Sequence, residues 1–222
     1  MAPSSTSAAP PTHQPLTARP ASLCRATAHD VAQLANVLAD AFNDDPVFER
    51  LLPNERTRPR GLQRFFHIEL RAVGLARGSV YTTDQLAGAA ISTGPGNWRL
   101  PPRVLALHGA AFARAFGVRL PRATTLLTRV ESRHVRQPHH YFAAIGVAPD
   151  QQGQGLGSGL MAPTLELCDR AGLPAYLEAS SERSAALYER LGFELVGELQ
   201  YGGREPLLLM LRPPNINEEQ TT

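Results

Sequence analysis

AAIGVAPDQQGQGLGS, residues 143–158, combines the marks of a strand, a glycine-rich loop and the first turn of a helix. Its first five residues, 143–147, form an apolar run typical of a buried strand. Ala148-Pro149-Asp150 ends this run, because proline cannot donate to a strand ladder and aspartate favours turns. A loop with glycine at alternate positions follows over 152–157. Leucines at helical spacing then predict a helix from residue 156 to about 170.

This order of elements favours the binding of an anion. Glycine has no Cβ, so its backbone can approach a ligand closely. The first N–H groups of a helix have no partner inside the helix, and the helix dipole places positive charge there. A pyrophosphate is therefore the expected ligand. The backbone N–H groups expected to hold it belong to Gln152, Gly153, Gln154, Gly155, Leu156, Gly157 and Ser158.

Two other interpretations of the loop remain open. Residues 157–162, GSGLMA, are a relaxed match to the Gly-x-Gly-x-x-Gly/Ala fingerprint of dinucleotide-binding folds, and Glu178 follows at roughly the expected ~20 residues. The first glycine of that match, however, lies well past the strand end at Val147. The other alternative is a loop that only turns the chain, but four glycines at alternate positions would then cost backbone entropy without a purpose.

Length and composition predict one folded domain with tails. The chain has 222 residues, of which 43% are hydrophobic, and its net charge is +2. It has no long basic run, so nucleic acid is not an expected partner. Cys24 and Cys168 provide neither a disulfide framework nor a metal-binding spacing, so no metal is expected. An apolar run of membrane-spanning length and a signal peptide are both missing, which predicts a soluble cytoplasmic protein without a membrane partner. We expect this protein to be a monomer or a homodimer.

The two ends differ in composition from the rest of the chain. Residues 1–21 are rich in Pro, Ser, Thr and Ala and predict a disordered tail, because such a segment buries too little apolar surface to offset its ordering entropy. Residues 213–222 are expected to fray. The single domain should therefore span residues 22–212.

Strands and helices alternate along this domain, which predicts an α/β fold. In the first half, we expect a strand at 23–25, helices over 31–42 and 61–76, a hairpin at 79–83 and 87–92, and a helical segment over 101–134 divided at Pro121. In the second half, we expect strands over 174–178, 193–199 and 206–211 and a helix over 180–191.

Three motifs, in order, resemble the GCN5-related N-acetyltransferase (GNAT) superfamily. Gln152-x-x-Gly155-x-Gly157 resembles its Gln/Arg-x-x-Gly-x-Gly/Ala pyrophosphate loop, and AYLEAS at 175–180 and ALYERLGF at 186–193 continue the likeness. The combination looks most like the puromycin N-acetyltransferase branch. One departure is Ser181, which stands where many relatives have an asparagine that contacts the pantetheine of the co-substrate.

The resemblance implies a fold and a reaction. The fold is a mixed, mostly antiparallel sheet of about seven strands flanked by helices and splayed between strands 4 and 5. The co-substrate is acetyl-CoA, and an amine attacks its thioester directly, without a covalent enzyme intermediate. The developing oxyanion needs a donor, for which backbone N–H groups around Ile145, Gly146 and Val147 are the candidates.

Two side chains are expected to move protons. Tyr188 matches the family's tyrosine, which donates a proton to the leaving thiolate, whereas without the motif it would be interpreted as a packing residue. Glu178, at the end of a strand beside the site, is the expected general base for the acceptor ammonium. The alternative is that Glu178 is only a solvated carboxylate at a strand end. Other candidates for the base, or for a relay through water, are Asp44, Asp45, His139 and His140.

The acceptor site is less well marked in the sequence. Asp44 and Asp45 precede Pro46, so they form either a helix terminator or the acidic rim of an amine-binding pocket. His139 and His140 lead into the strand without a usual metal-ligand spacing, and could line that pocket. Trp98 is either a wall of the pocket or a core residue.

The helical segment 101–134 falls where specificity varies in this fold. Its Leu- and Phe-rich composition favours a closed pocket over the open groove that a peptide needs. The run Arg129, Arg133, His134 and Arg136 predicts a solvated helix end rather than an acid-binding patch. The expected activity is acetylation of the primary amine of a small molecule, with an antibiotic such as puromycin as one option. A protein or peptide N-acetyltransferase and a non-catalytic acyl-CoA-binding sensor are the alternatives.

Overall fold

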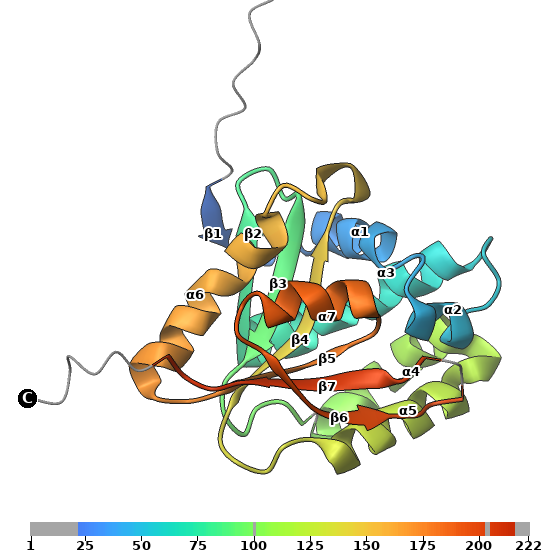
Figure 1. Cartoon of the computed structure of the whole chain (residues 1–222). Helices are drawn as coiled ribbons and strands as arrows, with labels where there is room; N and C mark the ends of the chain where they lie inside the picture. The colour runs from blue at the N-terminus through green and yellow to red at the C-terminus, as the bar shows by residue number, and fades with distance from the viewer. Residues whose placement is uncertain (1–21, 100, 203–204, 216–222) are drawn as a thin grey trace, which may run out of the picture.

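The computed structural model describes residues 22–99, 101–202 and 205–215, which form a seven-stranded sheet with helices on both faces (Figure 1). The strand order is β1-β2-β3-β4-β5-β7-β6. The strands are β1 (Leu23–Arg25), β2 (Gly78–Thr83), β3 (Gly88–Thr93), β4 (His140–Val147), β5 (Ala175–Ala179), β6 (Glu194–Leu199) and β7 (Leu207–Arg212). All neighbouring pairs are antiparallel except β4 and β5, which are parallel, so the expected mixed and mostly antiparallel sheet is confirmed.

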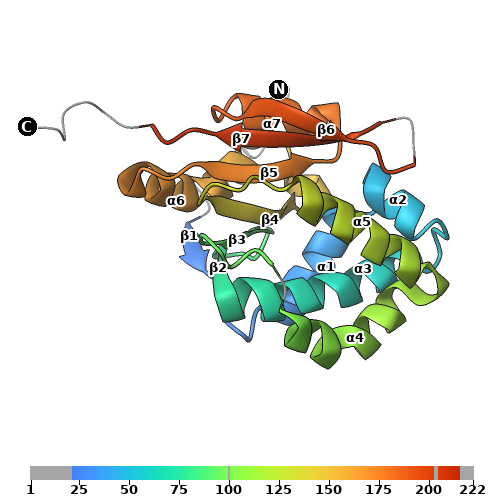
Figure 2. The same cartoon turned by 90° about the horizontal axis from the view of Figure 1, so that it is seen from below.

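The helices cover the sheet in two layers. They are α1 (Val31–Ala41), α2 (Pro46–Leu51), α3 (Arg58–Ile68), the π-helix η1 (Glu69–Leu75), α4 (Pro102–Phe116), the 3₁₀ turn η2 (Gly117–Arg119), α5 (Leu120–Arg133), the 3₁₀ turn η3 (Pro149–Gln151), α6 (Leu156–Ala171) and α7 (Glu182–Glu189). One apolar core lies between α1, α3, η1 and strands β2, β3 and β4, and a second joins α6 and α7 to β4, β5 and β7. Figure 2 shows α4 and α5 beside α2 and α3.

The expected tail at 1–21 and the end from 216 lie outside the described residues. Of the end that was expected to fray, the described part is 213–215, and there the backbone N–H of Asn215 donates to Asp169 Oδ1 at 2.7 Å. The last described residue is therefore attached to α6.

The backbone pairing between β4 and β5 is short. The two strands pair at His140 with Ala175 and at Tyr141 with Tyr176, and β4 then continues to Val147. Between Ile91 and Ser92 of β3, the register with β4 shifts so that Ala143 is an extra residue, a β-bulge. The expected splaying of the sheet between its fourth and fifth strands is thus confirmed.

Helix α1 packs directly on the splayed part of β4. A Cβ added to Gly146 would lie 2.7 Å from Leu38 Cδ2 and 3.0 Å from Phe42 Cε2. Real Cβ atoms do not approach their neighbours so closely, so glycine at 146 is what lets α1 lie against this strand.

No helix was expected from the sequence at the position of α2. Asp45 was expected either in a helix terminator or on the acidic rim of an amine-binding pocket. Helix α1 does end just before this turn, at Ala41, and the Oδ1 of Asp45 in addition accepts hydrogen bonds from the N–H groups of Val47 (2.9 Å) and Phe48 (3.2 Å). It therefore caps a new helix whose first residue is Pro46, an arrangement typical of helix N-termini.

The division of the 101–134 segment also differs from the expectation. The two helices separate at η2, where Gly117 has a φ of +52°. Pro121 lies in the first turn of α5, where its missing N–H leaves no intrahelical bond unmade. It therefore helps to begin a helix rather than to break one.

Candidate active site

The splayed edge of β4 carries unpaired backbone groups. Ala148 N–H donates to Ala87 O at 2.8 Å. Gly146, two residues earlier and opposite Ala89, therefore also directs its N–H toward β3. Because backbone groups alternate between the two edges of a strand, Ile145 and Val147 direct their N–H groups to the other edge, where β5 has moved away. The Gly146 N–H faces β3 and lies outside this row.

The glycine-rich loop presents its N–H groups to solvent. Gly153 and Gly155 have φ angles of +78° and +80°, which L side chains rarely adopt, and Gly155 is the N-cap of α6. The first backbone bond of α6 runs from Gly159 N to Gly155 O. No acceptor within the described part of the chain faces the N–H groups of residues 153–158. The loop thus has the unpaired donors that an anion needs, and its role as the pyrophosphate site stays a prediction.

Gln152 joins this loop to the strand edge. Its side-chain Nε2 donates to Val147 O at 3.1 Å, and its Oε1 accepts from Arg183 at 3.2 Å. Arg183 is exposed in the first turn of α7, so it brings a positive charge to the rim of the loop. No sequence pattern marked this residue, apart from its place one turn before the tyrosine motif.

Helix α7 faces the gap from the β5 side. Ser181 caps it, with its Oγ accepting from Ser184 N at 3.2 Å. Tyr188 lies in the same helix, is 7% exposed, and packs on Phe193 with ring centroids 5.9 Å apart. Burial, with a smaller contribution from the charge of Asp45, holds the pKa of Tyr188 well above its ordinary value. Its phenol is therefore protonated at neutral pH, as a proton donor must be.

Asp45 and Ser180 close the same end of the site. The Ser180 hydroxyl donates to Asp45 Oδ2, so that both carboxylate oxygens of Asp45 have partners. Burial raises the pKa of Asp45, although the hydrogen bonds from Ser180, Val47 and Phe48 oppose this shift. Asp44, by contrast, is exposed and bonds only to the neighbouring Asn43 side chain.

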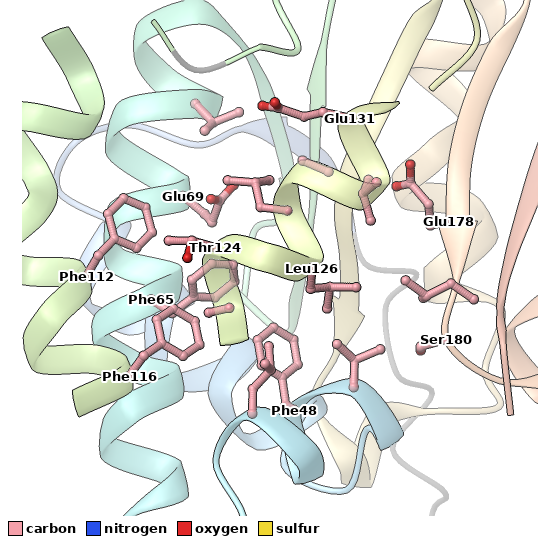
Figure 3. A pocket seen from close by; sticks show the side chains of 18 of the residues that line it. Phe48, Phe65, Glu69, Phe112, Phe116, Thr124, Leu126, Glu131, Glu178 and Ser180 are labelled. Atoms are coloured by element: carbon pink, nitrogen blue, oxygen red, sulfur yellow. The ribbon is translucent and has the colours of Figure 1, made fainter. Parts of the chain in front are cut away.

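A cavity of about 480 Å³ opens from this point and is lined mainly by apolar side chains of α2, α3, α4 and α5. Phe48, Phe65, Phe112 and Phe116 gather at one side of it, and Glu178 and Ser180 lie at the other (Figure 3). Trp98 is also part of the wall. The described lining contains carboxylates but no arginine, which suits an apolar ligand that carries positive charge.

Glu178 is the centre of a buried polar cluster in this wall. Its Oε2 accepts from the Tyr141 hydroxyl at 2.9 Å, and its Oε1 lies 3.5 Å from Nδ1 of His134. Burial, followed by the charge of Glu178, raises the pKa of Tyr141 well above its ordinary value. The interpretation of Glu178 as a solvated carboxylate does not fit, since its side chain is 9% exposed.

His134 was expected on a solvated helix end, and this prediction is wrong. Its side chain is 1% exposed and stacks on Trp98, with ring centroids 3.7 Å apart and planes 16° apart. Its Nε2 lies 2.9 Å from Nε2 of His139, whose Nδ1 is 2.7 Å from Gln137 O. Because a carbonyl can only accept, Nδ1 of His139 carries the proton of that bond.

The remaining predicted acceptor residues lie behind the wall. His139 is buried, which lowers its pKa, and it reaches the cavity only through His134. His140 is buried too, and neither histidine is part of the lining. Within the described ranges no three His, Cys, Asp or Glu side chains come together as a metal site, and no helix is long and apolar enough to cross a membrane.

Glu69 is a lining residue to which the sequence assigned no role. It is the first residue of the π-helix η1 and is half-buried on the wall formed by α3 and η1. None of the described residues gives its carboxylate a hydrogen bond or an ion pair, and burial raises its pKa to about 7. π-Helical turns often occur at functional sites, but no local sequence pattern marks this one.

Comparison with known proteins gives a consistent result. The model of the acetyltransferase (GNAT) family matches residues 38–193. An uncharacterized N-acetyltransferase of Schizosaccharomyces pombe is 31% identical over 214 residues, which cover 88% of this chain and 84% of the relative.

Solved structures agree with these matches. One described as histone acetyltransferase HPA2 and related acetyltransferase from Corynebacterium glutamicum superimposes with a TM-score of 0.64 at 25% identity, covering 89% of this chain and 98% of the other. The fold is also shared with arylalkylamine N-acetyltransferase 2 of Aedes aegypti, which is 14% identical and superimposes with a TM-score of 0.52. That superposition covers 89% of this chain and 100% of the other.

Proposed function

The chain belongs to the GNAT family of acetyltransferases, and on that basis we propose that it acetylates the primary amine of a small apolar molecule, using acetyl-CoA. One observation carries the proposal. The unpaired edge of β4 beyond Tyr141 lies between the free N–H groups of the glycine-rich loop and the acid-bearing apolar cavity. A nucleotide-linked thioester on that edge would present its carbonyl to a ligand in the cavity.

The residues that would hold acetyl-CoA are the loop and the strand edge. The N–H groups of Gly153 to Ser158 suit the pyrophosphate, whereas the Gln152 N–H, which was expected to join them, donates to Pro149 O at 3.5 Å. Arg183 adds a cation next to the loop. Ser181 is the candidate contact for the pantetheine, although its hydroxyl is also the cap of α7. Bound there, acetyl-CoA would supply an activated acetyl group.

Stabilisation of the oxyanion is assigned to the strand edge. The N–H groups of Ile145 and Val147 both point into the gap, so either can donate to the thioester oxygen as it becomes negative. Gly146, whose N–H faces β3, contributes by letting α1 pack under the strand.

Tyr188 and Glu178 are the proposed acid and base. The Tyr188 hydroxyl makes no hydrogen bond to any described residue, so it can donate to the leaving thiolate. The Oε1 of Glu178 is sealed against His134, so a proton from the acceptor ammonium would arrive at Oε2, directly or through the Tyr141 hydroxyl. His134 lies behind this carboxylate, with its Nδ1 3.5 Å from Oε1, and His139 contacts the other nitrogen of His134.

The size of the cavity supports a small acceptor. Side chains of α4 and α5 line one side of it, and a volume of about 480 Å³ suits a single small molecule better than an extended peptide. Asp45 contributes negative charge near the gap, while Asp44, which is exposed, would act only on an approaching amine from outside. An antibiotic amine such as puromycin is one acceptor of this kind.

A two-part experiment tests the proposal. Thermal shift with acetyl-CoA measures co-substrate binding, and release of free thiol is then followed over a panel of small primary amines, puromycin included, and of peptides. The proposal predicts stabilisation by acetyl-CoA and thiol release that depends on small amines. Release with peptides alone would support a peptide acetyltransferase, and binding without release on any amine would support an acyl-CoA sensor.

A further inference from the structure

The cavity has more acidic groups than the acetylation of one amine requires. Its described lining includes Asp45, Glu69, Glu131 and Glu178, and no arginine. Asp45 is bonded to Ser180 and to the first turn of α2, and Glu178 is bonded to Tyr141 and faces His134. Neither Glu69 on η1 nor Glu131 on α5 has a partner among the described residues, and Glu69 lies in a wall that is mostly aromatic and aliphatic.

An unpaired carboxylate in an apolar wall is unfavourable unless something compensates its charge. Partial loss of hydration without a partner destabilises the charged form of such a group. Glu69 comes from the α3–η1 side of the cavity, across from Glu178 on β5 (Figure 3). A positively charged group on the ligand would supply the partner that the protein itself does not provide.

The acids lie at different places along the cavity. The charge of Asp45 acts on Tyr188, the proposed acid at the gap, whereas the charge of Glu69 acts on Tyr141, whose hydroxyl is bonded to Glu178. Glu69 also shares its part of the wall with Val73 of η1, whereas Asp45 is fixed to Ser180 beside the gap. Because Glu69 comes from η1 and Glu178 from β5, on opposite sides of the cavity (Figure 3), an amine that gives its proton to Glu178 leaves the Glu69 carboxylate for another cationic group of the same ligand.

We propose that Glu69 binds a second cationic group of the acceptor, so that the preferred acceptors are molecules with two cationic nitrogens joined by an apolar body. This inference rests on the proposed acetylation of an amine in the same cavity. The phenylalanine rings of α2, α3 and α4 would pack on the apolar body, and the reacting nitrogen would lie at the gap.

The preference for such acceptors should depend on pH. The other titratable groups facing the cavity are Asp45 from α2, Glu131 and His134 from α5, Tyr141 from β4 and Glu178 from β5. Because burial raises the pKa of Glu69 to about 7, Glu69 is protonated and uncharged below that pH and charged above it. The advantage of a dication should therefore grow as the pH rises from 6 to 8, while the alkyl ammonium groups themselves stay charged (reference pKa about 10.4).

A substrate-by-variant comparison tests the inference. The kcat/KM is measured at pH 8 for linear alkyl monoamines and for α,ω-diamines of the same lengths, with wild type, Glu69→Gln and Glu55→Gln, an exposed carboxylate used as control. We expect the best diamine to exceed its matched monoamine about tenfold in wild type and in Glu55→Gln, which corresponds to about 1.4 kcal/mol. In Glu69→Gln, the ratio of diamine to monoamine kcat/KM should fall to about one, and because it is a ratio, any change common to both classes of amine cancels.

The outcomes separate this inference from the proposed function. Acetylation of monoamines and diamines at equal rates by wild type, or a preference that survives Glu69→Gln, would overturn the role of Glu69 alone. No acetylation of either class would overturn both proposals. Should Glu69→Gln fail to fold, the wild-type ratio at pH 6 and pH 8 decides, because a ratio that does not rise with pH contradicts the inference.

Discussion

The hydroxyl of Tyr141 on β4 donates a 2.9 Å hydrogen bond to Oε2 of Glu178 on β5, just past the last backbone pair that joins the two strands. Where the backbone pairing of β4 and β5 ends, a side-chain hydrogen bond joins the two strands instead. The bond fixes the carboxylate at the entrance to the cavity, and it places the proposed base next to the edge on which the thioester would lie.

Replacement of Tyr188 by phenylalanine should lower kcat by about 10² or more, since a positioned proton donor commonly contributes 10²–10⁴. Acetyl-CoA affinity should be nearly unchanged, because the ring remains packed on Phe193. Tyr81→Phe on β2, away from the gap, is the matched control. Steady-state kinetics and a binding titration check both parts, and a Tyr188→Phe enzyme with wild-type turnover would remove the tyrosine as acid.

Replacement of Glu178 by glutamine should lower kcat/KM and flatten the acid limb of its pH profile, because a glutamine cannot accept the proton of the ammonium. A fall of about 10² is expected for a lost general base. Glutamine can still accept from Tyr141 through its carbonyl oxygen, so the fold should survive. The pH–rate profile from pH 5 to pH 9 is the measurement, and a limb of unchanged shape would assign the base to another group.

Replacement of Gly155 by alanine should weaken acetyl-CoA binding about tenfold or more. A Cβ here meets no protein atom within 4 Å, but the φ of +80° disfavours alanine by about 1–2 kcal/mol and so distorts the loop. Gly159→Ala is the control, since its added Cβ is equally unobstructed and its N–H is already used inside α6. Isothermal titration should separate the two variants, and equal affinities would argue against the loop as the pyrophosphate site.

Replacement of Asp169 by asparagine should destabilise the protein by about 2 kcal/mol at pH 7. Asp169 binds Arg212 through two hydrogen bonds of 2.7 and 2.9 Å, and these bonds lower its pKa in the folded state. Because the folded pKa is lower than the unfolded one, this stabilisation is present above about pH 4 and is lost as the pH falls through the folded pKa.

Denaturant unfolding at several pH values measures the effect of Asp169→Asn. The control is Glu166→Gln, which removes an exposed pair with Arg170 and should change the unfolding free energy by at most about 1 kcal/mol. A difference between wild type and Asp169→Asn that persists unchanged below pH 3 would contradict the assignment.

The parts of the protein that follow from local sequence were predicted well. The strand, glycine-rich loop and helix at 143–171 depend on turn residues and on helical spacing, which are local properties, and each is found close to the expected bounds. The ordered motifs also predicted the splayed sheet. Asp45-Pro46 shows the limit, because an Asp-Pro pair can end one helix or begin the next, and here the side chain caps the next.

The wall of the cavity could not be predicted in the same way. The environment of His134 depends on Trp98, 36 positions earlier in the chain, and that of Glu69 on the rings contributed by α4. Helical periodicity marks which side of a helix is apolar, but it does not show which apolar side encloses a polar group. The bulge at Ala143, which sets the N–H groups of Ile145 and Val147 free, likewise has no sequence mark.

The most direct test of the account is mass spectrometry of the acceptor after incubation with ¹³C-acetyl-CoA and a panel of small apolar amines. We expect one labelled acetyl group on the primary amine, formed in step with the released thiol and reduced about 10² or more in Tyr188→Phe. A protein that binds acetyl-CoA but labels none of these amines, or that does not bind acetyl-CoA at all, would contradict the account.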